Sequence, residues 1–154
     1  MQKILGESNE WYILRSFEGS FTERYITAGD TLIEDEIYKI LSMPGSVPDL
    51  FLREDTNERR VYAIIPGLVD SSEIVYIDFS LQEGDSILLT RLDYWQHYWY
   101  WVDSIRYELT SDGPRKTMYL KGAKDEYGHY QYPTWMEGIG ALCDPILREF
   151  SSDE

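Results

Sequence analysis

Trp135-Met136-Glu137-Gly138-Ile139-Gly140 is the stretch from which the rest of the sequence is best interpreted. It combines one large indole, one carboxylate and two glycines, and such glycines permit a β-bulge or the close approach of another backbone. The chain before it is a series of short segments that are typical of β-strands. We therefore predict that this stretch is the closing strand of an all-β fold.

The segment from Trp101 to Leu109 has the clearest strand pattern in the chain. Successive side chains of a strand point to opposite faces, so Asp103 is predicted to share a face with apolar neighbours. Those neighbours are Trp101, Ile105, Tyr107 and Leu109. A hairpin turn is predicted at 111–114, because Asp-Gly readily adopts positive φ. The other predicted strands are 10–15, 21–27, 36–42, 50–53, 59–65, 73–79, 86–92 and 115–121.

These strands, about ten with the closing segment, are joined by short connections, and almost no helix is predicted. Short connections favour an antiparallel meander, either closed as a barrel or folded as a sandwich, and closure would remove exposed edges. We expect a single β domain over residues 10–150, which would include one helical turn at 145–150. Residues 1–9 are expected to be a loose lead-in, and residues 151–154 a frayed tail.

Composition limits the classes of partner. The chain of 154 residues carries 28 acidic and 14 basic side chains, a net charge of −14. Such a field repels phosphate backbones and anionic membranes, so a nucleic-acid partner is not expected. The charge suits solubility, or else a cationic or calcium-dependent partner. Aromatic residues make up 15% of the chain, and they favour strands.

The single cysteine, Cys143, allows neither an intrachain disulfide nor a zinc site built from several cysteines. No apolar run approaches the roughly 20 residues that span a bilayer, so no membrane span is expected. The first residues, Met1 to Glu7, lack the apolar stretch of a secretory signal. A signal peptide removed before this sequence begins stays compatible with the pattern.

The sequence resembles a group of uncharacterised exported proteins from Bacteroides-type bacteria that share a Trp-x-Glu-Gly-Ile-Gly signature near the C-terminus. The resemblance spans residues 11–142 and rests on segments 51–55, 61–62, 76–85, 102–105, 115–120 and 135–140. After Gly140 the sequence Ala141-Leu142-Cys143-Asp144-Pro145 departs from the small residues and further glycine that are usual in the group. The resemblance implies a periplasmic, cell-surface or secreted location, and it implies no activity.

Residues 94–101 form the densest aromatic segment, with six aromatic side chains in eight residues. If several rings are exposed, they would form a stacking platform for sugar rings or for apolar side chains of a partner protein. The candidate binding residues are Trp95, Tyr98, Trp99 and Trp101. The alternative is that the tryptophans fill the core while the tyrosines cover a rim. Aromatic residues occupy both odd- and even-numbered positions of the run, which point to opposite faces of a strand. We therefore expect uncovered rings on at least one face.

Signals for catalysis are weaker. Asp103 and Glu137 lie in otherwise apolar stretches, and two carboxylates about 5–10 Å apart could act as acid and base in glycoside hydrolysis. Alternatively, each accepts hydrogen bonds that hold neighbouring strands in register. The two histidines, His97 and His129, lack metal-ligand spacing, and the sequence has no nucleophile elbow or phosphate-binding loop. No cofactor and no metal are expected.

Three functions remain open at this point. The first is a non-enzymatic exported β-module that binds a glycan or a surface partner through the 94–101 segment. The second is a lipocalin-like barrel with an internal pocket for a small apolar ligand. The third, which the sequence favours least, is an acid-type hydrolase that uses Asp103 and Glu137.

Overall fold

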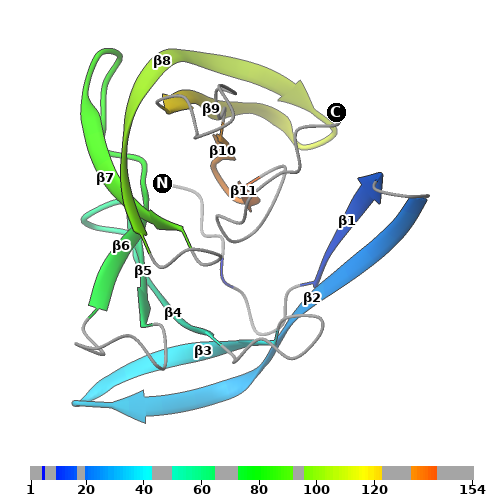
Figure 1. Cartoon of the computed structure of the whole chain (residues 1–154), viewed down its shortest axis with the longest axis vertical. Helices are drawn as coiled ribbons and strands as arrows, with labels where there is room; N and C mark the ends of the chain where they lie inside the picture. The colour runs from blue at the N-terminus through cyan, green and yellow to red at the C-terminus, as the bar shows by residue number, and fades with distance from the viewer. Residues whose placement is uncertain are drawn as a thin grey trace.

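The computed structural model describes Leu5 and residues 10–16, 20–42, 50–64, 73–91, 96–122 and 133–141. The described chain is all-β and consists of antiparallel strands in two sheets, with no helix in this part (Figure 1). One sheet contains, side by side, β1 (Glu10–Ser16), β2 (Ser20–Ile33), β3 (Glu36–Ser42), β4 (Leu50–Asp55), β5 (Arg60–Ile64) and β6 (Glu73–Asp78). The other contains, from edge to edge, β11 (Gly140–Ala141), β10 (Thr134–Met136), β9 (Gly113–Gly122), β8 (Gln96–Thr110) and β7 (Ser86–Arg91).

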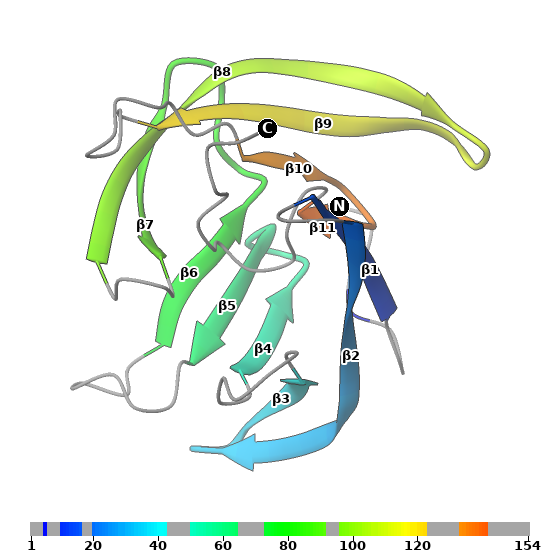
Figure 2. The same cartoon turned by 45° about the vertical axis from the view of Figure 1, so that its right-hand side comes forward.

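The predicted all-β class and antiparallel pairing are confirmed. Within each sheet every described strand pairs with its neighbour along the chain, and β6 and β7 are the consecutive strands that belong to different sheets. The strands curve around a common interior as a half-barrel (Figure 2). The finer prediction, a closed barrel or a sandwich, stays a prediction. The predicted helical turn at 145–150, the frayed tail and most of the lead-in lie outside the described residues.

The predicted closing strand is in fact two very short strands. β10 ends at Met136, a turn covers residues 137–139, and β11 returns antiparallel to pair with β10. Gly138 and Gly140 have φ of 82° and 100°, a left-handed conformation that residues with a Cβ rarely adopt. The two glycines therefore reverse the chain here, rather than forming a bulge within one strand.

Both sheets contribute to one apolar core. Trp135 of β10 is 1% exposed, and its ring meets Phe79, which follows β6, edge to face with the centroids 6.4 Å apart. The first sheet adds buried residues of β3 to β6, and Leu5 from the predicted lead-in is buried with them. The remaining core residues are Leu41, Leu50, Leu52, Val61, Ala63, Tyr76, Ile77, Leu89, Tyr100, Val102, Met118 and Leu120.

Two polar contacts also join the sheets. Arg59, in the turn between β4 and β5, forms an ion pair with Glu137 across 3.0 Å. The Nζ of Lys116 on β9 donates a hydrogen bond to the carbonyl of Phe79 across 3.0 Å. Burial lowers the pKa of Lys116, and the nearby Arg59 charge lowers it further. The closing segment thus holds the two sheets together by both packing and charge.

Candidate functional site on the outer face of β7 and β8

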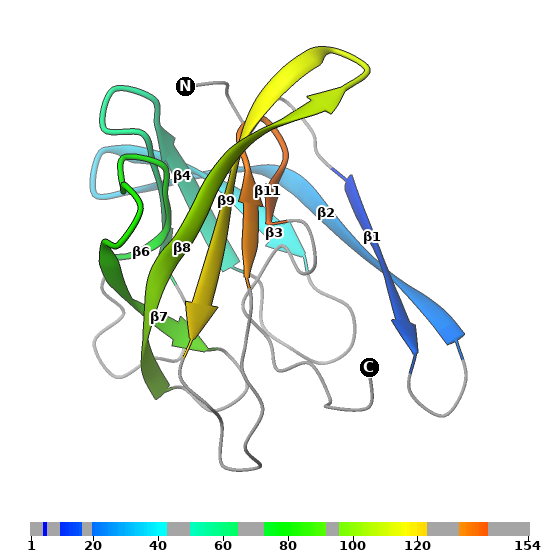
Figure 3. The same cartoon turned by 90° about the horizontal axis from the view of Figure 1, so that it is seen from above.

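Residues 96–101 of the aromatic segment lie on β8, which is the second strand of its sheet and has β7 on one side and β9 on the other (Figure 3). Tyr100 is buried, and Tyr98 packs against the core. Trp99 and Trp101 point the other way and are 60% and 36% exposed. Trp95 lies outside the described residues.

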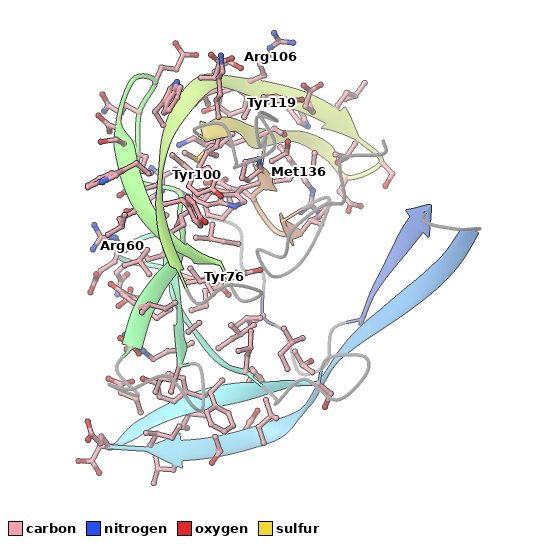
Figure 4. The ribbon with its side chains drawn as sticks, viewed as in Figure 1. Arg60, Tyr76, Tyr100, Arg106, Tyr119 and Met136 are labelled. Atoms are coloured by element: carbon pink, nitrogen blue, oxygen red, sulfur yellow. The ribbon has the colours of Figure 1, made fainter. Side chains whose placement is uncertain are left out.

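For the described rings, the interpretation in which tryptophans fill the core is wrong. The tyrosines face inward, because the ring of Tyr100 lies over Gly122, its cross-strand partner on β9, where no side chain competes for the space. Figure 4 shows Tyr100 on the concave side of β8. The four candidate residues therefore do not lie on one face. The structure brings Trp99 and Trp101 together and places Tyr98 on the opposite side.

A third residue, not predicted from the sequence, lies next to Trp99 on the same outer surface. Leu88 of β7 is directly opposite Trp99 in the register and is 44% exposed. Its neighbours Ile87 and Leu89 pack in the core, so the alternation within β7 could have shown that Leu88 points outward. We call Leu88, Trp99 and Trp101 the aromatic face. Two residues along a strand span roughly 7 Å, so the indoles form a short row on the open surface of the sheet.

A β-bulge lies immediately beside this row. The register of β8 against β9 shifts between Val102 and Ser104, so Asp103 has no partner in the ladder. Val102 is buried and Ile105 packs against the core, whereas Asp103 is exposed. The prediction that Trp101 and Ile105 share a face is therefore wrong, because the extra residue reverses the alternation.

Farther along β8 the outer face is polar, and its side chains contact one another. The guanidinium of Arg106 lies 5.6 Å from the ring centroid of Tyr119 on β9. The Tyr119 hydroxyl donates a hydrogen bond to Glu108 across 2.6 Å, and this bond raises the pKa of Tyr119. Figure 4 shows Arg106 pointing away from the molecule above β8, next to Tyr119. The aromatic face ends where this cluster begins.

The two carboxylates of the hydrolase hypothesis lie apart. Glu137 pairs with Arg59, and its backbone amide donates to the carbonyl of Lys116. Asp103 lies two strands away and three to four residues along the sheet, which corresponds to roughly 15 Å between the backbones. Glycoside hydrolysis needs carboxyl groups about 5–10 Å apart. The arrangement favours the alternative interpretation, in which Glu137 holds strands together.

In the described part of the chain, no three side chains of histidine, cysteine, aspartate or glutamate are grouped so that they could hold a metal ion. The same part contains no helix with the length and apolar character needed to cross a membrane.

A separate charged cluster links four strands of the first sheet. Arg53 of β4 donates two hydrogen bonds to Glu73 of β6, at 2.7 and 3.0 Å, and Tyr38 of β3 donates a third. The guanidinium of Arg53 also lies over the ring of Tyr62, which is on β5. The hydrogen bonds from Arg53, with that of Tyr38 in addition, lower the pKa of Glu73. These side chains satisfy one another and support the sheet.

This cluster should make stability sensitive to acid. A carboxylate with a lowered pKa in the folded state stabilises the protein above its unfolded pKa, and this stability is lost as the pH falls through the folded pKa. We expect the urea midpoint to fall less between neutral and acidic pH in Glu73→Gln than in the unmodified protein. Glu34→Gln, in the exposed turn between β2 and β3, is the control and should keep the original dependence. Parallel profiles for all three proteins would contradict the assignment.

Comparisons of the chain with models of known families, with curated proteins and with solved structures give no match. The function is therefore inferred from geometry, and the aromatic face is the exposed apolar surface of the described residues that carries two indole rings. A large exposed indole beside an exposed leucine gains nothing from the fold, since its burial would be favourable.

Proposed function

We propose that this protein is a non-enzymatic carbohydrate-binding module and that the aromatic face is its binding surface. The observation that carries the proposal is the exposure of Trp99, with Leu88 directly across and Trp101 next in the row. Indole rings offer flat apolar area with little conformational entropy to lose, which suits the C–H face of a sugar ring. A row of rings on an open sheet favours an oligosaccharide, which can contact both indoles at once.

The location and the closure of the fold are part of the same proposal. An exported or cell-surface role is supported by the sequence resemblance and suits a protein that binds extended glycans. A closed barrel is supported by the core that both sheets share and by the contact between β6 and β7, whose hydrogen-bond ladders are separate. A lipocalin-like pocket has less support, because Phe79, Tyr100 and Trp135 fill the interior between the sheets.

Calorimetric titration with cello-, xylo-, malto- and chito-oligosaccharides tests the proposal. We expect saturable binding of at least one series, and about tenfold weaker binding by Trp99→Ala, the loss typical of a central aromatic contact. Tyr107→Ala removes an exposed aromatic ring of β8 on the far side of the bulge, and it should bind like the unmodified protein. Binding of fatty acids but of no glycan, or unchanged affinity in Trp99→Ala, would refute the proposal.

A further inference from the structure

We infer that the aromatic face selects a positively charged sugar and that its ligand is an amino-sugar oligosaccharide with free amines. The inference rests on the proposed function and adds the chemical class of the ligand. Its basis is the carboxylate that the bulge in β8 places beside the indole row.

Among the described residues, the side chain of Asp103 does not stabilise the fold through a polar contact. Asp103 is exposed, it is the unpaired residue of the bulge, and within the described part of the chain it makes no hydrogen bond or ion pair. Bulges occur frequently beside functional sites, where they re-aim a side chain. Here the extra residue puts a carboxylate with no partner next to Trp101, on the same outer face.

A further carboxylate lies beside the same bulge. The turn before β7 runs along Val102, with Gly84 N donating to Val102 O and Val102 N donating to Asp85 O. Glu83 accepts a hydrogen bond from Ile105 N across 2.9 Å, which fixes its carboxylate at the bulge. Asp85 accepts one from Gln82 N across 2.8 Å. Glu83 uses one oxygen in this way, so its negative charge stays at the bulge. Asp85 precedes Ser86, the cross-strand partner of Trp101, so its side chain starts from the opposite face of the sheet.

Two positive charges lie near these carboxylates. Lys121 of β9 lies opposite Trp101 in the register, and Arg106 stacks over Tyr119 farther along β8. Asp103 and Glu83 thus place two carboxylates at one end of the row, in a protein whose net charge is −14. A local field of this sign attracts cations and repels sulfated or uronic-acid sugars.

An amino sugar matches both parts of the surface. Its ring can stack on an indole through C–H groups while its ammonium group lies near Asp103, and indole rings themselves attract cations. A neutral sugar would gain the stacking alone. A lysine-rich peptide would be attracted by the same charges, but its flexible side chains would stack less well on two adjacent flat rings.

The test compares three hexasaccharides with the same β-1,4 linkage, built from glucose, N-acetylglucosamine or glucosamine. Titrations at low salt and slightly acidic pH keep the glucosamine amines protonated. We expect the glucosamine hexamer to bind about tenfold tighter than the two neutral hexamers, and added salt to remove this preference. Asp103→Asn should weaken glucosamine binding about three- to fivefold and reduce the preference for glucosamine over the neutral hexamers.

Asp35→Asn is the matched control, because it makes the same charge change in the exposed turn between β2 and β3. It should leave all three affinities unchanged, and if it weakens glucosamine binding as much as Asp103→Asn, the inference fails. Equal binding of the three hexamers leaves the carbohydrate proposal standing and overturns the charge preference. Absence of binding by every sugar overturns both. Binding of oligolysine in place of glucosamine, lost in Asp103→Asn, assigns the surface to a basic peptide and overturns the inference.

Discussion

Replacement of Trp135 by alanine is expected to lower the free energy of unfolding by about 3–5 kcal/mol, the usual cost of deleting a large buried aromatic side chain. The indole is 1% exposed and contacts Phe79, so its removal leaves a cavity between the two sheets. Urea denaturation monitored by circular dichroism measures the loss. Since domains of this size are stabilised by only about 5–15 kcal/mol, the variant should be near its unfolding threshold at room temperature.

Two variants make this prediction specific. Trp135→Phe retains a ring against Phe79 and should lose less stability than Trp135→Ala. Trp99→Ala removes the same side chain from the exposed aromatic face, and it should change stability by no more than about 1 kcal/mol. If Trp99→Ala were as damaging as Trp135→Ala, the indole of the aromatic face would belong to the core, and the binding proposal would lose its basis.

Substitution of Gly122 by alanine is expected to destabilise the protein by about 1–3 kcal/mol, the cost of overpacking a core. A Cβ at this position would lie 2.6 Å from one ring carbon of Tyr100 and 2.9 Å from another. The ring is buried and paired across the strands with Gly122, so it has little room to move away. Thermal and urea denaturation would both detect the loss.

A double-mutant cycle isolates the cause. In a Tyr100→Val background the ring is absent, and Gly122→Ala should cost little. The coupling between the two positions should then approach the full cost of Gly122→Ala alone. An equal cost in both backgrounds would show that the penalty comes from the backbone of β9 rather than from the Tyr100 ring.

Much of the fold could be predicted where turns follow common chemistry. β3 has the predicted bounds Glu36–Ser42, and the hairpin at Ser111–Asp112 lies in the predicted turn. The predicted strand 21–27 ends too early, because β2 continues to Ile33 and Gly29 sits at an irregularity within it. The chain reverses instead at Glu34 and Asp35, which have φ of 46° and 67°. Turn rules that depend on glycine or asparagine do not identify such a pair.

The candidate site shows the same limit. The aromatic composition of 94–101 indicated exposed rings. Because odd- and even-numbered positions both carry aromatic residues, composition could not say which rings face the core. The alternation around Ile105 also gave the wrong face for Trp101, because a bulge at Asp103 separates them. A bulge depends on how two strands share their hydrogen bonds, and one strand's sequence does not contain that information. Leu88 belongs to the site only through pairing of β7 with β8.

The link between Arg59 and Glu137 joins positions 78 residues apart, and its consequence concerns the order of synthesis. The first sheet leaves the ribosome well before β10, so its apolar face, with Leu41 and Val61, is not fully covered until Trp135 arrives. Contacts of such long sequence separation form late in folding, and an uncovered sheet is prone to aggregate meanwhile. The nascent chain is therefore expected to be most prone to aggregation before its last strands emerge.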